Sequence, residues 1–174
     1  MVPRPSIRIA LCVLLAVPLV VAVAPTGAAP PPRPLCDACG ESFEERVEDR
    51  GVAVDGEFVT YPIEVSRSTA EVGVGKNGTA MWTVRNHLDD SAGAEQLRSN
   101  ASYRTRIADG AMGDAELLNA TVNQTNVLTL RYRESGFAEQ SVRGTLRSGE
   151  FTSTYGYRNL HGLGADRLVV VAPE

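Results

Sequence analysis

Two pairs of segments alternate apolar and polar residues with the two-residue period of a β-strand. The first pair is joined by Lys76-Asn77-Gly78, a sequence typical of a hairpin turn. A three-residue loop would pair Val72 with Trp82 and would place all apolar side chains on one face. It would also give Gly78 the left-handed conformation that ends such a loop. The apolar positions of this hairpin are Ala70, Val72, Val74, Ala80, Trp82 and Val84.

The second pair, residues 118–122 and 128–132, predicts another hairpin. One register collects its apolar residues on one face and leaves residues 124–126 as the loop. It pairs Leu118 with Tyr132, Ala120 with Leu130, and Val122 with Leu128. We expect the opposite face to be polar and wet, because it carries Asn119, Thr121, Asn123, Thr129 and Arg131.

Two further segments have the period of amphipathic helices. Asp89 or Asp90 can cap a helix that runs to about Ala108, with Asn100 outside its apolar stripe. Ser42-Phe-Glu-Glu45 resembles a capping box that opens a shorter helix, which Gly51 would end. The buried stripes would consist of Ala94, Leu97, Ala101 and Ile107 or Ala108 in the long helix, and of Phe43 and Val47 in the short one.

The remaining strand signals lie on either side of these elements. Tyr61, Ile63 and Val65 alternate as one strand, and the unbroken apolar run from Leu168 to Ala172 indicates a strand central to a sheet. Antiparallel hairpins with one substantial helix predict an α+β fold, in which the sheet packs against one main helix.

The beginning of the chain has the organisation of an export signal. Arg4 and Arg8 precede the apolar run from Ile9 to Ala24, and small residues and prolines follow it. The run is shorter than the roughly 20 residues that span a bilayer, so cleavage is favoured over an uncleaved N-terminal anchor. Both arrangements place the domain outside the membrane.

We therefore divide the chain into three parts. Residues 1–28 form the signal peptide, or the N-terminal anchor, with cleavage after Ala28. Residues 29–57 hold the proline-rich exit, a Cys-x-x-Cys motif and the short acidic helix. Residues 58–174 form an α+β extracellular domain, and the 146 residues after the signal are enough for one domain but too few for two.

The charge of the exported part limits its partners. Residues 29–174 hold 15 basic and 21 acidic residues, a net charge of −6, and eight of the acids lie between Asp37 and Glu57. Because nucleic-acid binding requires a basic footprint, this balance argues against nucleic acid and equally against anionic lipid. The basic residues are almost all arginine, with Lys76 the only lysine.

Four Asn-x-Ser/Thr sequons follow the export signal, where chance predicts about one. Because a glycan needs an exported, accessible asparagine, the excess favours a glycosylated surface. The alternative is that these asparagines only serve turns and polar strand faces. The candidate glycosylation sites are Asn77, Asn100, Asn119 and Asn123.

Cys36 and Cys39 are the only cysteines outside the signal. In an oxidising exterior we expect a local disulfide between them, in a loop too small to contribute much stability. One alternative is a redox-active dithiol at a helix N-terminus, although the strand that normally precedes such a motif is missing. Another is a zinc site formed by Cys36, Cys39, His87 and His161, a ligand set of the right size without a spacing signature.

No catalytic motif is found in the sequence. None of the serines lies in a Gly-x-Ser-x-Gly elbow, and His161 with Asp166 is only a local pair in a glycine-rich segment. We therefore expect no catalytic activity and no cofactor.

The segments from Arg67 to Asn86 and from Tyr155 to Glu174 resemble a group of uncharacterised haloarchaeal surface proteins. The resemblance covers most of the exported part. It implies a signal peptide, a β-rich outer domain and often a C-terminal membrane helix, with no assigned activity. This sequence has no second apolar span before Glu174, so the resemblance implies a shortened member of the group.

Taken together, these features predict a secreted or surface-displayed glycoprotein that binds an unknown surface or envelope partner or serves as an envelope component. One alternative is an exported zinc-binding or thiol-redox protein built on Cys36 and Cys39. The other is the extracellular sensing head of a truncated membrane receptor, held to the membrane by its N-terminal segment or by a missing C-terminal span.

Overall fold

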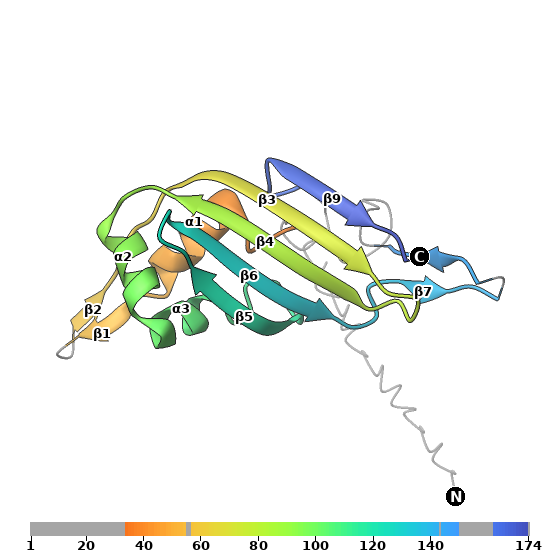
Figure 1. The fold of residues 1–174 in the computed structure, drawn as a ribbon. Helices are drawn as coiled ribbons and strands as arrows, with labels where there is room; N and C mark the ends of the chain where they lie inside the picture. Colours follow the sequence, from red (N-terminus) through yellow and green to blue (C-terminus); the bar gives the residue numbers. More distant parts are fainter. Residues whose placement is uncertain (1–33, 55–56, 143, 150–161, 174) are drawn as a thin grey trace, which may run out of the picture.

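The computed structural model describes residues 34–54, 57–142, 144–149 and 162–173 and has an α+β fold (Figure 1). The predicted signal peptide and His161 lie outside the described residues. The helices are α1 (Gly40–Asp49), α2 (Ala92–Ser99) and α3 (Ala101–Ala108). A five-stranded sheet has the order β5 (Glu116–Val122), β6 (Val127–Glu134), β4 (Ala80–Leu88), β3 (Val65–Val74) and β9 (Arg167–Val171). Two small hairpins pair β1 (Val52–Val54) with β2 (Glu57–Val59), and β7 (Glu139–Gln140) with β8 (Leu146–Arg147).

The hairpin of β3 and β4 has the predicted register. Val72 pairs with Trp82, and both side chains are buried on the face that meets the helices. The amide of Gly75 donates to the carbonyl oxygen of Thr79, which closes a three-residue loop. Gly78 takes the expected left-handed conformation with φ of 78°.

The hairpin of β5 and β6 confirms two predicted pairs and corrects the third. Ala120 pairs with Leu130 and Val122 with Leu128, but Leu117, not Leu118, pairs with Tyr132. The register shifts between Leu117 and Asn119, so the strand bulges at Leu118 and turns this side chain outward. The alternation of apolar and polar residues gives no sign of such an extra residue.

The strand β9 was predicted to be central in the sheet, and this is wrong. It lies at the edge of the sheet and runs parallel to β3. Val170 and Val171 are nearly half exposed, at 48% and 46%. A continuous apolar run therefore arises here from an edge strand in which only Leu168 and Val169 are partly buried, and the run alone does not distinguish it from a central strand.

The predicted long helix is two helices that meet at Asn100. Ser91, not Asp89 or Asp90, caps α2 through a hydrogen bond from the amide of Ala94. The side-chain oxygen of Asn100 accepts from the amide of Tyr103 and caps α3, so the chain begins a new helix there. The break turns the predicted core residue Ala101 to solvent.

The short helix and the segment after it also differ from the prediction. The helix α1 begins at Gly40, before the expected capping box at Ser42, and no side chain caps it. Residues 60–64 form no strand; Pro62 lacks the amide that a strand ladder needs, although Ile63 is buried as expected.

The core lies between the sheet and the three helices. Phe43 and Val47 of α1, as predicted, and Leu97 and Ile107 of α2 and α3 are fully buried against it. The indole of the buried Trp82 donates to the partly buried Glu134, 2.8 Å away, so its polar edge is satisfied. The helix α1 thus belongs to the same core as the sheet.

Arg46 and Tyr132 form hydrogen bonds with the C-terminal end of α3. Tyr132 donates its hydroxyl to the carbonyl oxygen of Ala108, and Arg46 donates to those of Ile107 and Asp109. Because a helix leaves its last four carbonyl groups without partners, these contacts supply what α3 lacks. The planar, multi-donor guanidinium suits this role better than an ammonium group.

Candidate surface for binding

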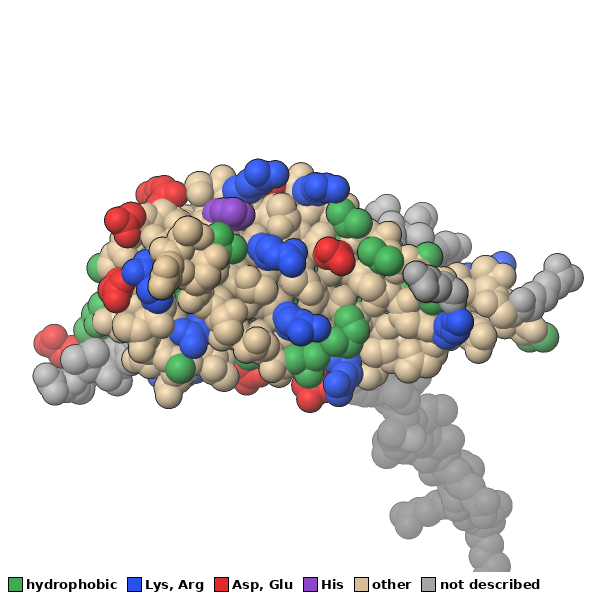
Figure 2. Space-filling model, viewed as in Figure 1, with side chains coloured by type: hydrophobic (Ala, Val, Ile, Leu, Met, Phe, Trp, Pro, Cys, Tyr) green, Lys and Arg blue, Asp and Glu red, His purple; other side chains and the backbone are tan. Residues whose placement is uncertain are grey.

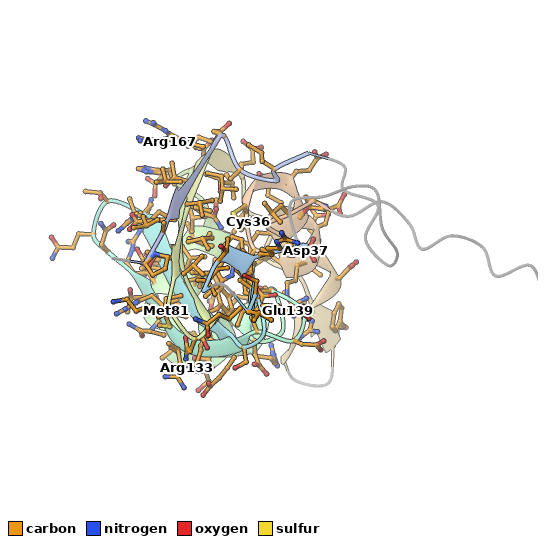
Figure 3. All side chains as sticks on the ribbon, turned by 90° about the vertical axis from the view of Figure 1, so that its right-hand side faces the viewer. Cys36, Asp37, Met81, Arg133, Glu139 and Arg167 are labelled. Carbon is orange, nitrogen blue, oxygen red and sulfur yellow. A yellow bond between two sulfur atoms is a disulfide. The ribbon has the colours of Figure 1, made fainter. Side chains whose placement is uncertain are left out.

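The two faces of the five-stranded sheet have different surroundings. The helices cover one face, and among the described residues no helix covers the other, here called the open face (Figures 1 and 3). In Figure 3, Cys36 lies on the helical side of the sheet and Arg167 on the open side. The open face consists of Arg67, Thr69, Glu71, Met81, Thr83, Arg85, His87, Glu116, Asn119, Thr121, Thr129, Arg131, Arg133, Arg167 and Val169.

Strand register arranges the open face in rows. Thr69 of β3 pairs with Arg85 of β4 on one side and with Arg167 of β9 on the other. Because neighbouring strands lie about 4.8 Å apart, the Cα atoms of the two arginines are roughly 10 Å apart across Thr69. The row continues through Thr129 and Thr121, and the next row is Val169, Glu71, Thr83, Arg131 and Asn119.

The charge of the open face is opposite to that of the chain. The whole sequence carries −4, yet this face holds five arginines against Glu71 and Glu116. Figure 2 shows these basic side chains spread over the sheet, with few acidic groups among them. Four exposed acids of α1, namely Glu41, Glu45, Glu48 and Asp49, lie instead behind the sheet.

The arginines of the open face differ from the others in their partners. In the helical layer every guanidinium donates to an oxygen atom: those of Arg46, Arg50, Arg98, Arg104 and Arg106. On the open face, Arg133 forms an ion pair with Glu116 at 3.1 Å. The other four, Arg67, Arg85, Arg131 and Arg167, have no hydrogen bond or ion pair within the described part of the chain. No described residue therefore occupies their donors.

A shallow hollow of about 220 Å³ lies on the open face where β9, β3 and β4 meet. Arg85, Arg167 and Glu71 supply its charged groups, and Thr69 lies between the two arginines. Val169 supplies an apolar wall. The hollow thus offers two cations and one anion beside a hydroxyl group.

The four sequons are all exposed and lie at separate places. Asn77 is at the tip of the β3–β4 hairpin, Asn123 at the end of β5, Asn100 between α2 and α3, and Asn119 on the open face opposite Arg131. Three of them use only the side-chain oxygen: Asn77 accepts from the amide of Thr79, Asn123 from that of Thr125, and Asn100 from that of Tyr103. Their Nδ2 atoms, to which a glycan would attach, donate to no described group.

Cys36 and Cys39 lie with their sulfur atoms 1.96 Å apart, and both side chains are fully buried. The turn that they form is held by Asn86 of β4, which is also fully buried. The amide nitrogen of Asn86 donates to the carbonyl oxygen of Ala38, and its oxygen accepts from the hydroxyl of Ser68. Both sulfur atoms are thus shielded, whereas a redox-active dithiol needs an accessible sulfur atom.

The structure does not assemble the proposed zinc ligands. His87 is on the open face of β4, and its neighbour Asn86 points into the core toward the cysteines. The sheet therefore separates His87 from Cys36 and Cys39. No group of three or more metal-ligating side chains occurs among the residues that the structure describes.

The comparisons with known proteins add no identity to this geometry. No family model, no curated protein and no solved structure matches the chain. Within the described ranges, no helix is long and apolar enough to cross a membrane.

Sequence reasoning missed the open face as a cationic surface. The count of charges predicted an acidic protein, and the arginines at issue are single residues scattered over β3, β4, β6 and β9. The signal was present in the alternation: on β3, β4 and β6 many of the positions between the buried residues hold arginine or threonine. Only strand order, above all the pairing of β9 with β3, brings Arg167 beside Arg85.

Proposed function

We propose that the chain is an exported, N-glycosylated surface domain that acts by binding an acidic partner through the open face. The observation that carries this proposal is the set of four arginines that have no partner among the described residues, on a sheet face that no described helix covers. The arginines of the helical layer are each engaged in holding the fold, whereas these four contribute no such contact.

The charge asymmetry supports an acidic partner. The cations on the open face attract an acidic partner, and the acidic remainder of the domain repels it. The charge distribution therefore orients such a partner toward the open face. The threonine hydroxyls between the arginines add uncharged groups that can donate and accept hydrogen bonds. Such a face suits recognition.

The binding test compares two charge-matched variants. Arg85→Gln with Arg131→Gln removes two cations from the open face, and Lys76→Gln with Arg147→Gln removes two exposed cations elsewhere. Labelled protein is titrated onto cell envelopes isolated from the producing organism. We expect the open-face variant to bind at least tenfold more weakly, since two charge-assisted hydrogen bonds are lost, and the control to bind within about twofold of wild type. Equal loss in both variants would reject the open face as the binding surface.

Export and glycosylation are tested by the intact mass of the protein recovered from outside the cell. A mass above that of residues 29–174 that falls on deglycosylation supports the proposal. Alkylation before and after reduction reports the state of Cys36 and Cys39. An unmodified mass, or protein found only inside the cell, contradicts it.

A further inference from the structure

We infer that the hollow between β9, β3 and β4 is a subsite for one hexuronic acid unit of an acidic polysaccharide. This inference rests on the proposed function and names the chemistry of the partner. It follows from three properties of the hollow: its paired arginines, the carboxylate beside them, and its size.

The paired arginines provide the anion-binding element. Arg85 and Arg167 flank Thr69, and neither has a hydrogen bond or ion pair among the described residues. A guanidinium presents its donors as a planar fork that matches the two oxygens of a carboxylate. A carboxylate above Thr69 can therefore receive donors from both sides.

Glu71 makes the hollow unsuited to a simple anion. Its carboxylate lines the same hollow and has no partner in the described part of the chain. It lies on the same strand face as Thr69, two residues and about 6.8 Å further along β3. An ionised carboxylate accepts hydrogen bonds only, so the ligand must offer a donor within a few ångströms of its own negative charge. A ring that bears a carboxylate and neighbouring hydroxyl groups meets both requirements.

The remaining lining residues fit the same ligand. Thr69 presents a hydroxyl group between the two arginines, and Val169 offers an apolar wall to the carbon atoms of a ring. The volume of about 220 Å³ is below the lower limit of roughly 300 Å³ for sites that enclose a drug-sized molecule. One ring can occupy the hollow while the polymer continues over the open face toward Arg131.

The experiment uses three short probes on the exported protein labelled with ¹⁵N. The probes are trigalacturonate, its neutral methyl ester, and an acetylated and amidated triglutamate peptide that also carries three carboxylates. Amide shifts are followed at Thr69, Glu71 and Arg167 at constant ionic strength. We expect trigalacturonate to shift these amides and the methyl ester to shift none of them. Arg85→Gln and Arg167→Gln should each weaken binding about tenfold, and Arg147→Gln, an exposed arginine outside the open face, should leave it unchanged.

The variant Glu71→Gln tests the contact between a hydroxyl group of the ligand and the carboxylate of Glu71. Removing the negative charge strengthens binding of any anion, so the variant should bind triglutamate more tightly and lose part of the preference for the sugar. Because the hollow is exposed, the affinity for trigalacturonate should fall as salt rises.

Two results would overturn the inference. One is triglutamate binding as tightly as trigalacturonate at the same amides, which makes the hollow a general anion surface and leaves the proposed function standing. The other is no shift with trigalacturonate while binding to envelopes still depends on Arg85 and Arg131. If envelope binding is also independent of these arginines, the proposed function fails together with the inference.

Discussion

The side-chain amide of Asn86 on β4 donates a hydrogen bond to the carbonyl oxygen of Ala38, 2.8 Å away, inside the turn of the two cysteines. Asn86 is fully buried, and its oxygen also accepts from the hydroxyl of Ser68 at 2.7 Å. One side chain therefore joins β4, β3 and the segment before α1. Buried polar groups that keep all their partners specify one arrangement of the core, and groups that lose them are costly.

The first prediction follows from this contact. Asn86→Ala leaves the carbonyl of Ala38 and the hydroxyl of Ser68 without a partner, each at a cost of about 1–3 kcal/mol. We expect the free energy of unfolding to fall by about 3 kcal/mol in urea denaturation of the unglycosylated protein. Asn119→Ala, at an exposed position of the sheet, is the control and should change it by less than about 0.5 kcal/mol. A similar loss in both variants would show that the buried amide has no special role.

Gly78 gives the second prediction. Its φ is 78°, and a Cβ atom there would lie 1.8 Å from the carbonyl oxygen of Ala138. Gly78→Ala should therefore cost more than about 2 kcal/mol, combining backbone strain with displacement of the segment before β7. Gly136→Ala, with φ of 75° and open space around it, isolates the strain and should cost about 1 kcal/mol. Thermal unfolding of both variants gives the comparison, and equal melting temperatures would contradict the close approach.

Asn100 combines a helix cap with a sequon, and the third prediction separates them. Its oxygen accepts from the amide of Tyr103, 2.9 Å away, so Asn100→Ala should lower the free energy of unfolding by about 1 kcal/mol. Asn100→Asp keeps the acceptor and removes the glycan site, so it should preserve stability while the mass of one glycan is lost from the exported protein. If the aspartate variant is as unstable as the alanine variant, the capping role is wrong.

The fourth prediction concerns alkaline pH. Burial in the core raises the pKa of Tyr132 above its usual value, and the nearby charge of Arg46 opposes the shift only in part. The unfolded chain then loses a proton above about pH 10 that the folded protein keeps. Stability is unaffected below this pH and falls as the pH rises further, by up to about 1.4 kcal/mol per pH unit.

Tyr132→Phe removes this proton, so the decline of stability between pH 9 and 11 should be less steep than in wild type. Tyr103 is the internal comparison, because burial also raises the pKa of its hydroxyl and Tyr103→Phe should reduce the slope as well. An unchanged slope in Tyr132→Phe would contradict the buried, neutral state of the hydroxyl. The measurement is chemical denaturation at each pH.

The elements that alternation defines locally could be predicted from the sequence. The pairing of Val72 with Trp82 follows from the two-residue alternation and from the loop, whose left-handed position is suited to Gly78. The bulge at Leu118 could not be predicted, because one inserted residue changes the register without changing composition. Asparagine is a common N-cap residue, so Asn100 was a signal for the start of a new helix. The apolar period continues across it, however, and therefore predicted one long helix.

The surface proposed for binding depended on contacts distant in sequence. Arg85 and Arg167 are separated by most of the domain, and nothing local to either residue indicates the other. They meet because β9 joins β3 in parallel, a pairing that no turn specifies. The buried cysteines are the opposite case, since their spacing pointed to a local bond and the sulfur atoms lie together.

The parallel pairing of β9 also bears on when the domain can finish folding. Thr69 on β3 meets Arg167 on β9, and the amides of Leu35 and Cys36 donate to the carbonyl oxygens of Gly162 and Leu163. The start and the end of the described region thus depend on each other, and contacts of such sequence separation form late and slowly. A ribosome must release the chain through Val171 before β9 can pair with β3. Until then the edge of β3 is exposed to pairing with other chains.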